Sequence, residues 1–290
     1  MRQQKDTSCN ETGRFVPFHT ISNGAAKVSD LQETNGGRIL GADEPHPLET
    51  FNKNTQSDYF IICEHAGRRI PASLGTMGLS EEDRKRHIAW DIGARSVAVA
   101  LSQALEAPLY MQRYSRLICD CNRHPDVLDF APEISEATPI PGNQDLSQAD
   151  RKARADAIFW PFHDAVAEAL ALREKNGLTT KVVTIHSFTP SYLGKSRPWE
   201  IGILYNRDLA LAPAIAEWLK AETDLYVGVN QPYAVSDDSD YSIPVHGEKR
   251  GLPCVEFEIR NDLISSDEEA EKWAALIRQA LFAVEATGSV

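Results

Sequence analysis

Short apolar runs alternate with longer amphipathic stretches through most of the chain. The short runs predict buried β-strands at residues 59–63, 108–111, 117–121, 182–185, 200–206 and 254–262. The amphipathic stretches, with apolar residues three or four positions apart, predict helices at residues 91–105, 147–176, 208–222 and 266–284. Strands that alternate with helices in this way are typical of an α/β domain built on an open sheet.

Residues 1–56 differ from the rest of the chain. They show no sustained apolar period and contain several turn-forming residues, among them Gly36, Gly37 and Pro45. A segment of this composition buries too little apolar surface to fold alone. We therefore expect an N-terminal arm over residues 1–56, packed on a single α/β domain formed by residues 57–290.

Composition and charge narrow the class of ligand. The chain has 290 residues, 42% hydrophobic and 25% charged, which is enough for one large domain with an ample core. Its formal net charge is -12, and no stretch supplies the basic footprint that nucleic acid or an anionic membrane requires. We therefore expect a small-molecule or peptide ligand, and neither a nucleic-acid nor a membrane partner.

The cysteines and the N-terminal residues bear on the cellular compartment. The five cysteines are an odd number, and Cys119 and Cys121 lack the CxxC spacing of structural zinc sites. The N-terminal residues contain no apolar signal-peptide core, and no run approaches the ~18 apolar residues of a membrane-spanning helix. These features predict a cytoplasmic protein with reduced cysteines.

Two of the predicted strands end in a histidine. Residues 59–63 lead into Glu64 and His65, and residues 182–185 lead directly into His186. A side chain at a strand end is held on a rigid element and faces the crevice where open α/β sheets bind ligands. One such histidine could equally be a core residue bonded to a loop carbonyl. The repetition favours a metal-binding or catalytic pair.

Further polar side chains lie where predicted elements begin or end. Asp91 starts a predicted helix four residues after His87, so the two would share one face of a helical turn or form a surface ion pair. Asn122 and Arg123 follow the strand predicted at residues 117–121. The arginine is suited to holding a ligand carboxylate, although a structural pair with a nearby aspartate is an alternative.

The last predicted strand and the stretch before it add more candidates. Glu256 and Glu258 share one face of the strand, so either can supply a carboxylate near its end. The polar, turn-rich residues 231–253 form a connection that is unusually long for a compact domain, and such loops are often functional. They offer three possible ligand contacts, Tyr241, His246 and Arg250.

These residue types are those of a hydrolytic zinc site. Zinc held by two histidines and one carboxylate lowers the pKa of a bound water to ~7 and polarises a carbonyl group. A glutamate that does not bind the metal then transfers the proton to the leaving nitrogen. The chain has no P-loop, GxGxxG or GxSxG motif that would indicate another chemistry. Amide hydrolysis is the predicted reaction.

Five short motifs, in their order and spacing, resemble those of the N-formylglutamate amidohydrolase family. They are EHAGRRIP, AWDIGA, YSRLICDCNR, TIHS and VEFEI, and the resemblance covers residues 57–265. More distantly, TIHSF, FEIRND and the Asn122–Arg123 pair are similar to segments of the zinc carboxypeptidases. The resemblance implies a three-layer α/β/α sandwich with a mixed sheet, of the phosphorylase/hydrolase-like type.

The resemblance also implies roles for the metal ligands and the base. His65 and His186 would bind zinc, and Glu258 would be the general acid/base, with Glu256 as the alternative on the same face. The third ligand departs from the carboxypeptidase pattern, because Arg68 stands where those enzymes have a glutamate.

Two acidic residues are candidates for the third ligand. We choose Asp91, with Glu64 as the alternative. Asp91 can reach inward from a helix start, whereas Glu64 alternates to the opposite side of its strand from His65.

The implied substrate is N-formyl-L-glutamate. By the same resemblance, Asn122 and Arg123 would hold the α-carboxylate of the substrate. Arg116 is a further candidate for substrate binding. The residues themselves leave other N-acyl amino acids open. Two further alternatives are a zinc carboxypeptidase-like peptidase and a non-catalytic ligand-binding protein that keeps the fold.

Overall fold

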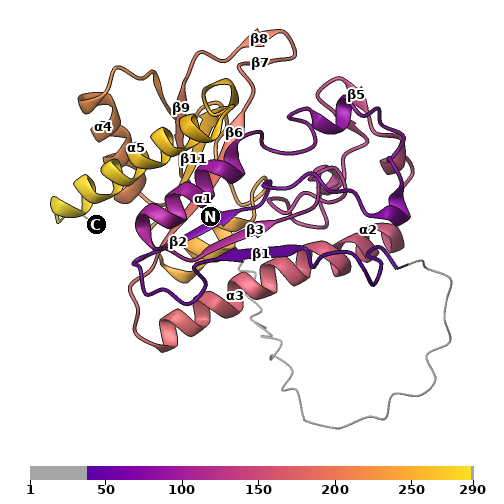
Figure 1. Ribbon diagram of the computed structural model, residues 1–290, viewed down its shortest axis with the longest axis horizontal. Coiled ribbons are helices and arrows are strands. Elements are labelled where there is room, and N and C mark those ends of the chain that lie inside the picture. Colours follow the sequence, from indigo (N-terminus) through magenta and orange to yellow (C-terminus); the bar gives the residue numbers. More distant parts are fainter. Residues whose placement is uncertain (1–37, 289–290) are drawn as a thin grey trace, which may run out of the picture. The chain divides into compact units, whose positions relative to one another are not determined.

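A mixed seven-stranded β-sheet forms the centre of the computed structural model, which describes residues 38–288 (Figure 1). Its strands are β1 (Leu48–Phe51), β2 (Tyr59–Cys63), β3 (Leu109–Gln112), β6 (Lys181–Phe188), β9 (Ile201–Leu204), β10 (Val227–Val229) and β11 (Cys254–Arg260). Their order across the sheet is β1-β3-β2-β6-β11-β9-β10. The four neighbours β3, β2, β6 and β11 are parallel, whereas β1 and β9 run antiparallel to β3 and β11. Two small hairpins lie outside this sheet, β4 (Ile134–Ser135) with β5 (Thr138–Pro139) and β7 (Ser191–Tyr192) with β8 (Lys195–Ser196).

Helices cover both faces of the sheet, because strand side chains point alternately to either side. The α-helices are α1 (Ala94–Leu105), α2 (Gln148–Arg154), α3 (Trp160–Lys175), α4 (Leu211–Glu222) and α5 (Asp267–Ala286). Ile61 and Val183 pack with α1, α4 and α5 in one core. The neighbouring Ile62 and Val182 pack with α3 in the other. The expected three-layer α/β/α sandwich with a mixed sheet is confirmed.

The helix expected at residues 147–176 is divided in two. Ser147 begins α2 with a capping box, in which its side chain and that of Asp150 each accept a backbone hydrogen bond. A π-helical turn, Ala155–Phe159, then leads into α3. Pro161 at the start of α3 has no backbone N–H to continue a regular helix, so the break falls where the sequence places the proline.

The prediction of a strand at residues 117–121 is wrong. Their backbone N–H groups pair with separate segments: Ile118 donates to Ser115 O at 3.0 Å, and Asp120 donates to Phe130 O at 2.7 Å. The apolar side chains of this run are nevertheless buried. The run is apolar because it packs in a core. Short apolar runs occur both in buried turns and in strands, so the pattern alone does not distinguish the two.

Strand β1 lies on the N-terminal side of the domain boundary expected at residue 57. It pairs antiparallel with β3 at the edge of the sheet, with Leu48 opposite Gln112. Part of the range expected to be an arm is therefore a strand of the main sheet. Residues 1–37 lie outside the described residues, and the arm expected there stays a prediction.

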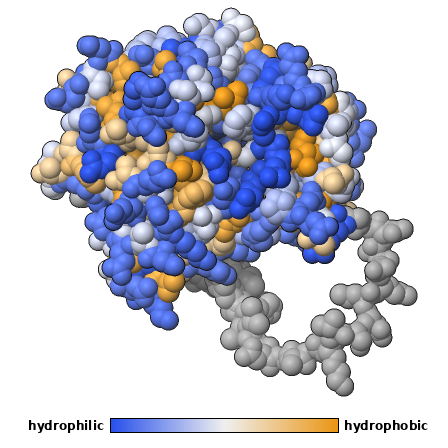
Figure 2. All heavy atoms as spheres, viewed as in Figure 1, coloured by the Kyte–Doolittle hydropathy of each residue, from blue (hydrophilic) through white to orange (hydrophobic). Residues whose placement is uncertain are grey.

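The face of the molecule seen in Figure 2 is largely hydrophilic. On the face shown in Figure 2, hydrophilic side chains predominate and apolar atoms form scattered patches. This agrees with a chain in which 25% of residues are charged. Among the helices of residues 38–288, none is both long and apolar enough to cross a membrane.

Gly93 determines how closely α1 approaches its neighbours. Its φ is +82°, in the left-handed region, and a Cβ atom at this position would lie 2.3 Å from Ile264 O. Only glycine satisfies both conditions without strain. The turn that contains Asp91 can therefore pack against the connection between β11 and α5.

Gly93→Ala should lower the free energy of unfolding by about 2–4 kcal/mol, because the left-handed backbone and the clash with Ile264 O add together. Gly177→Ala is the matched control, since Gly177 has a φ of +68° but no atom within 4 Å of the added Cβ. That variant should lose only about 1 kcal/mol. Chemical denaturation measures both changes, and equal losses would contradict the packing role of Gly93.

Candidate active site

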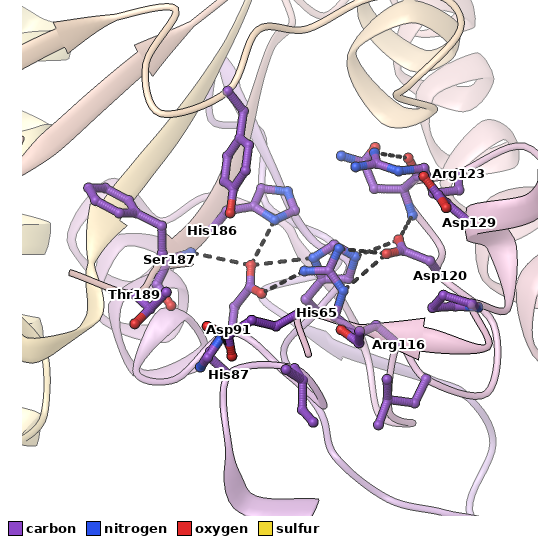
Figure 3. Close-up of a pocket in the computed structure, with 18 of the residues that line it drawn as sticks. His65, His87, Asp91, Arg116, Asp120, Arg123, Asp129, His186, Ser187 and Thr189 are labelled. Atoms are coloured by element: carbon purple, nitrogen blue, oxygen red, sulfur yellow. Dashed lines mark hydrogen bonds and ion pairs between the residues drawn. The ribbon is translucent and has the colours of Figure 1, made fainter. Parts of the chain in front are cut away.

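Two neighbouring parallel strands bring His65 and His186 to the same end of the sheet. β2 and β6 pair up to Ile62 opposite Thr184, and both histidines lie just beyond this pair. Asp91 reaches the same place from the turn before α1, where its backbone N–H donates to His65 O at 3.0 Å. The three side chains converge in one cavity (Figure 3).

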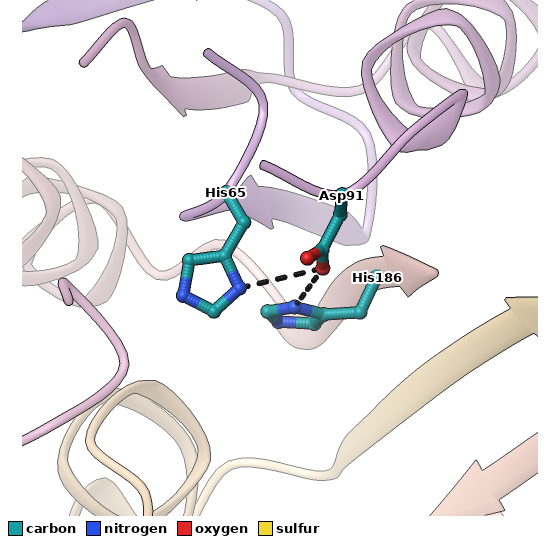
Figure 4. Close-up of side chains that lie close together, drawn as sticks. All are labelled: His65, Asp91 and His186. Atoms are coloured by element: carbon teal, nitrogen blue, oxygen red, sulfur yellow. Dashed lines mark hydrogen bonds and ion pairs between the residues drawn. The ribbon is translucent and has the colours of Figure 1, made fainter. Parts of the chain in front are cut away.

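Asp91 joins the two imidazoles through a single oxygen (Figure 4). Its Oδ2 lies 2.9 Å from His186 Nδ1 and 3.3 Å from His65 Nδ1. The same oxygen accepts a hydrogen bond from the backbone N of Ser187 at 3.2 Å. All three side chains are buried, and one potential ligand atom from each lies within 4.8 Å of the others. Two imidazoles and a carboxylate placed in this way could hold a metal ion.

A further carboxylate flanks each imidazole at its other nitrogen. His65 Nε2 lies 2.7 Å from Asp120 Oδ1 (Figure 3). His186 Nε2 lies 3.1 Å from Glu64 Oε2, in an ion pair that lacks hydrogen-bond alignment. Partners of this kind fix the tautomer and direction of a histidine that binds metal through the other nitrogen. Glu64 thus lies next to Nε2 of His186, whereas Asp91 lies next to Nδ1 of the same ring.

The charges around the histidines favour a cation. Burial opposes a charged imidazole, but Glu256, Glu64 and Asp91 raise the pKa of His186 well above its usual value. Burial likewise opposes ionisation of Glu64, yet the charge of His186 holds the pKa of this carboxyl at about 2. Buried carboxylates that stay ionised need a positive charge among them. A protonated histidine provides it, and a divalent cation would provide it as well, so these residues fit a metal.

Strand β11 places two glutamates beside His186. Its parallel pairing with β6 sets Glu258 opposite His186 and Glu256 opposite Thr184. Glu256 Oε2 accepts a hydrogen bond from Thr184 Oγ1 at 3.2 Å, whereas Glu258 Oε2 is buried without a hydrogen-bond partner among residues 38–288. Burial raises the pKa of Glu256 to about 7 and that of Glu258 well above its usual value. Glu258 therefore offers a free carboxyl group next to the histidines.

Arg116 connects the carboxylates around the histidines. Its Nη1 donates to Asp91 Oδ1 at 3.2 Å, and its Nη2 donates to Asp120 Oδ2 at 2.6 Å (Figure 3). Burial opposes the charge of Asp120, but Arg116 and His65 hold the pKa of this carboxyl well below its usual value. Arg116 thus keeps both aspartates ionised while it borders the cavity.

The cavity beside these groups has a volume of about 290 Å³, a size that suits a small molecule. The seven residues chosen for the site all border it: His65, Asp91, Arg116, Asn122, Arg123, His186 and Glu258. The structure therefore brings together side chains that are far apart in the sequence. Their individual roles stay predictions.

Three candidates from residues 231–253 lie elsewhere. His246 is buried, with Nε2 2.9 Å from His163 Nδ1, and Tyr241 packs on the same His163 ring. Arg250 ends a short helical turn on the surface. None of the three belongs to the cavity wall.

The expected contact between His87 and Asp91 is not formed either. His87 borders the cavity, but its Nε2 lies 3.4 Å from Glu136 Oε2. The chain between His87 and Asp91 runs through turns rather than through a helix. The four-residue spacing therefore does not place the two side chains on one face.

Sequence reasoning missed the roles of Asp120 and Asp240. Asp120 lies at the end of the run 117–121, just before Asn122 and Arg123, and its carboxylate contacts His65 and Arg116 rather than Arg123. Asp240 borders the cavity from the 231–253 loop and contacts Arg123 across a sequence separation of 117 residues. No local pattern in the sequence could have indicated that contact.

Comparisons with known proteins support a common family. A family model described as N-formylglutamate amidohydrolase matches residues 57–265. The chain is similar to the gene product Atu2144 from Agrobacterium tumefaciens, a solved structure, with 40% identity and a TM-score of 0.84 over 86% of this chain and 99% of that one. No curated protein matches the chain.

A second solved structure shares the fold. It is the N-formylglutamate amidohydrolase from Ralstonia eutropha JMP134, with 17% identity and a TM-score of 0.55 over 83% of this chain and 98% of that one. The family match itself covers more than half of the chain. The chain therefore belongs to the N-formylglutamate amidohydrolase family.

Proposed function

We propose that this protein is a zinc-dependent amidohydrolase that releases a free amino acid from N-formyl-L-glutamate or a related N-acyl amino acid. The observation that carries the proposal is the buried His65–Asp91–His186 group beside the unpartnered carboxyl group of Glu258. These are the parts that metal-assisted amide hydrolysis requires. Membership of the amidohydrolase family supports the same reaction class.

His65 and His186 would bind zinc through Nδ1, and Asp91 would bind it through Oδ2, because these three atoms already converge. Asp120 and Glu64 would accept hydrogen bonds from the Nε2–H groups, so that both histidines bind as neutral imidazoles through Nδ1. Zinc at this position supplies a Lewis acid that polarises the amide carbonyl and lowers the pKa of water.

Glu258 would act as the general acid/base. It lies opposite His186 on the neighbouring strand and has a free, buried oxygen. It would take the proton from the attacking water and give it to the nitrogen of the leaving amino acid, as the bond between the acyl carbon and this nitrogen breaks. Glu256 is less suited to this role, because its Oε2 is bonded to Thr184.

Arg123 would bind the α-carboxylate of the substrate, because a guanidinium group can pair with a carboxylate through two parallel hydrogen bonds. Arg116 would contact the acyl oxygen through N–H groups that its ion pairs with Asp91 and Asp120 leave unused. Asn122 lies in the wall next to Arg123. The cavity of about 290 Å³ favours an amino-acid derivative over a longer peptide.

His65→Ala and His186→Ala should each lose bound zinc and activity together, because two remaining protein ligands hold the ion too weakly. Asp91→Ala should also lose zinc. Glu64→Gln should weaken zinc binding less, by about 10–100-fold, because Glu64 acts only through His186. Elemental analysis after dialysis against a zinc buffer series gives the affinities. Full zinc in either histidine variant, or a larger loss in Glu64→Gln than in Asp91→Ala, would contradict these ligands.

Glu258→Gln should keep zinc and lower kcat by roughly 10²-fold or more, the usual scale for loss of a general acid/base. Glu256→Gln is the matched control on the same strand face, and its kcat should fall much less. The assay uses N-formyl-L-glutamate, with N-acetyl-L-glutamate and a glutamyl dipeptide to test other acyl groups and peptidase activity. An inactive Glu256→Gln enzyme beside a normal Glu258→Gln enzyme would reverse the assignment.

A further inference from the structure

The loop between β10 and β11 contacts both Asn122 and Arg123. Asp240 in this loop accepts hydrogen bonds through Oδ1 from Arg123 Nη1 at 3.1 Å and from Asn122 Nδ2 at 3.3 Å. Its Oδ2 accepts a hydrogen bond from the backbone N of Ser236 at 3.0 Å and another from Ser239 Oγ. One carboxylate oxygen thus faces Arg123, and the other holds Asp240 within its own turn.

Arg123 uses only part of its guanidinium group in these contacts. Its Nη1 donates to Asp240 Oδ1, to Asn122 O at 2.9 Å and to Ser239 O. Within residues 38–288, its Nε and Nη2 atoms have no hydrogen-bond or ion-pair partner. The side chain is 24% exposed and borders the cavity. The edge formed by Nε and Nη2 therefore remains available to the two oxygens of a carboxylate.

The same loop engages the amide oxygen of Asn122 and one N–H of its Nδ2. Its Oδ1 accepts hydrogen bonds from the backbone N of Tyr241 at 3.0 Å and of Ser242 at 3.1 Å, and its Nδ2 donates to Asp240. The backbone N of Asn122 donates to Asp120 Oδ1 at 2.8 Å. Asn122 thus fixes the loop to the carboxylate that flanks the candidate metal site.

We propose that Asp240 is a positioning residue that orients Arg123 toward a carboxylate group of the substrate, and that Asn122 holds Asp240 in place. An unrestrained arginine side chain loses rotamer freedom when it binds a ligand, at a cost in free energy. Asp240 orders Nη1 beforehand and leaves the Nε–Nη2 edge for the ligand. The inference rests on the proposed function, because the carboxylate belongs to the N-acyl amino acid.

The alternative is that Asp240 competes with the substrate for Arg123. Asp240 contacts Arg123 through one oxygen at one nitrogen, so it does not occupy the edge that a substrate carboxylate would use. Its side chain is only 10% exposed, and its second oxygen is bonded within its own turn. A competitor would have to break these bonds before the substrate could enter, which favours positioning.

Asp240→Asn keeps the size of the side chain and removes its charge. For an N-formyl amino acid with a free α-carboxylate, KM should rise roughly 10-fold with little change in kcat, the scale of one hydrogen bond to a charged group. KM for the corresponding α-amide should stay the same. Asp238→Asn is the matched control, because Asp238 is exposed in the same loop and makes no hydrogen bond or ion pair within the described chain.

Three outcomes would overturn the proposal. They are an equal rise in KM for acid and amide, no change for either, and a fall in KM for the acid, which would make Asp240 a competitor. If Asp240→Asn does not fold, Ser239→Ala replaces it as the test. Ser239→Ala removes the hydroxyl donor to Asp240 Oδ2 without changing the charge, so it should raise KM for the acid selectively by a smaller factor.

Calorimetry with L-glutamate and its α-amide tests the same inference without turnover. The wild-type protein should bind the acid more tightly than the amide, and Asp240→Asn should lose most of this preference. A wild-type protein that binds the acid no better than the amide would overturn the inference. A protein that shows this preference but hydrolyses no N-formyl substrate would count against the proposed function alone.

Discussion

The shared carboxylate of Asp91 is the contact on which the site depends. Its Oδ2 lies within hydrogen-bond distance of Nδ1 in both His65 and His186. This requires the turn before α1 to reach the ends of β2 and β6, which the close packing at Gly93 allows. Arg116 holds the other oxygen of the same carboxylate. Carboxylates buried around two imidazoles need a balancing positive charge, so geometry and charge both favour a cation here.

The sheet and the loops position different residues of the site. Parallel pairing of β11 with β6 sets Glu258 opposite His186, and a shift of one residue in this register would turn Glu258 to the other face. Glu258 and His186 thus lie on rigid strands, and His65 lies in the turn directly after β2. Arg123, by contrast, comes from a loop and depends for its orientation on Asp240 in a second loop. The sheet therefore positions the residues proposed for catalysis. Contacts between loops position the residue proposed to bind the substrate carboxylate.

Local sequence patterns were sufficient to predict the strands next to the site, but not the contacts between distant segments. The apolar runs predicted β2 and β6 and the position of His65 directly after β2, whereas β6 continues beyond its expected end, through His186 to Phe188. The helix start expected at Asp91 then added this residue to the same site, and the structure brings it there. The buried turn at residues 117–121 was mistaken for a strand, because burial and strand formation select the same apolar residues. The contact between Asp240 and Arg123 depends on tertiary packing alone. No hydrophobic pattern within one segment predicts it.

Anomalous diffraction at the zinc absorption edge, on crystals of the zinc-loaded protein, would show most directly whether Asp91 and the two histidines form a metal site. We expect one strong anomalous peak at about 2.0–2.2 Å from Asp91 Oδ2 and from the Nδ1 atoms of His65 and His186, the usual zinc distances for these ligands. A peak on the Glu64 side of His186, or no peak near these three atoms, would contradict the site.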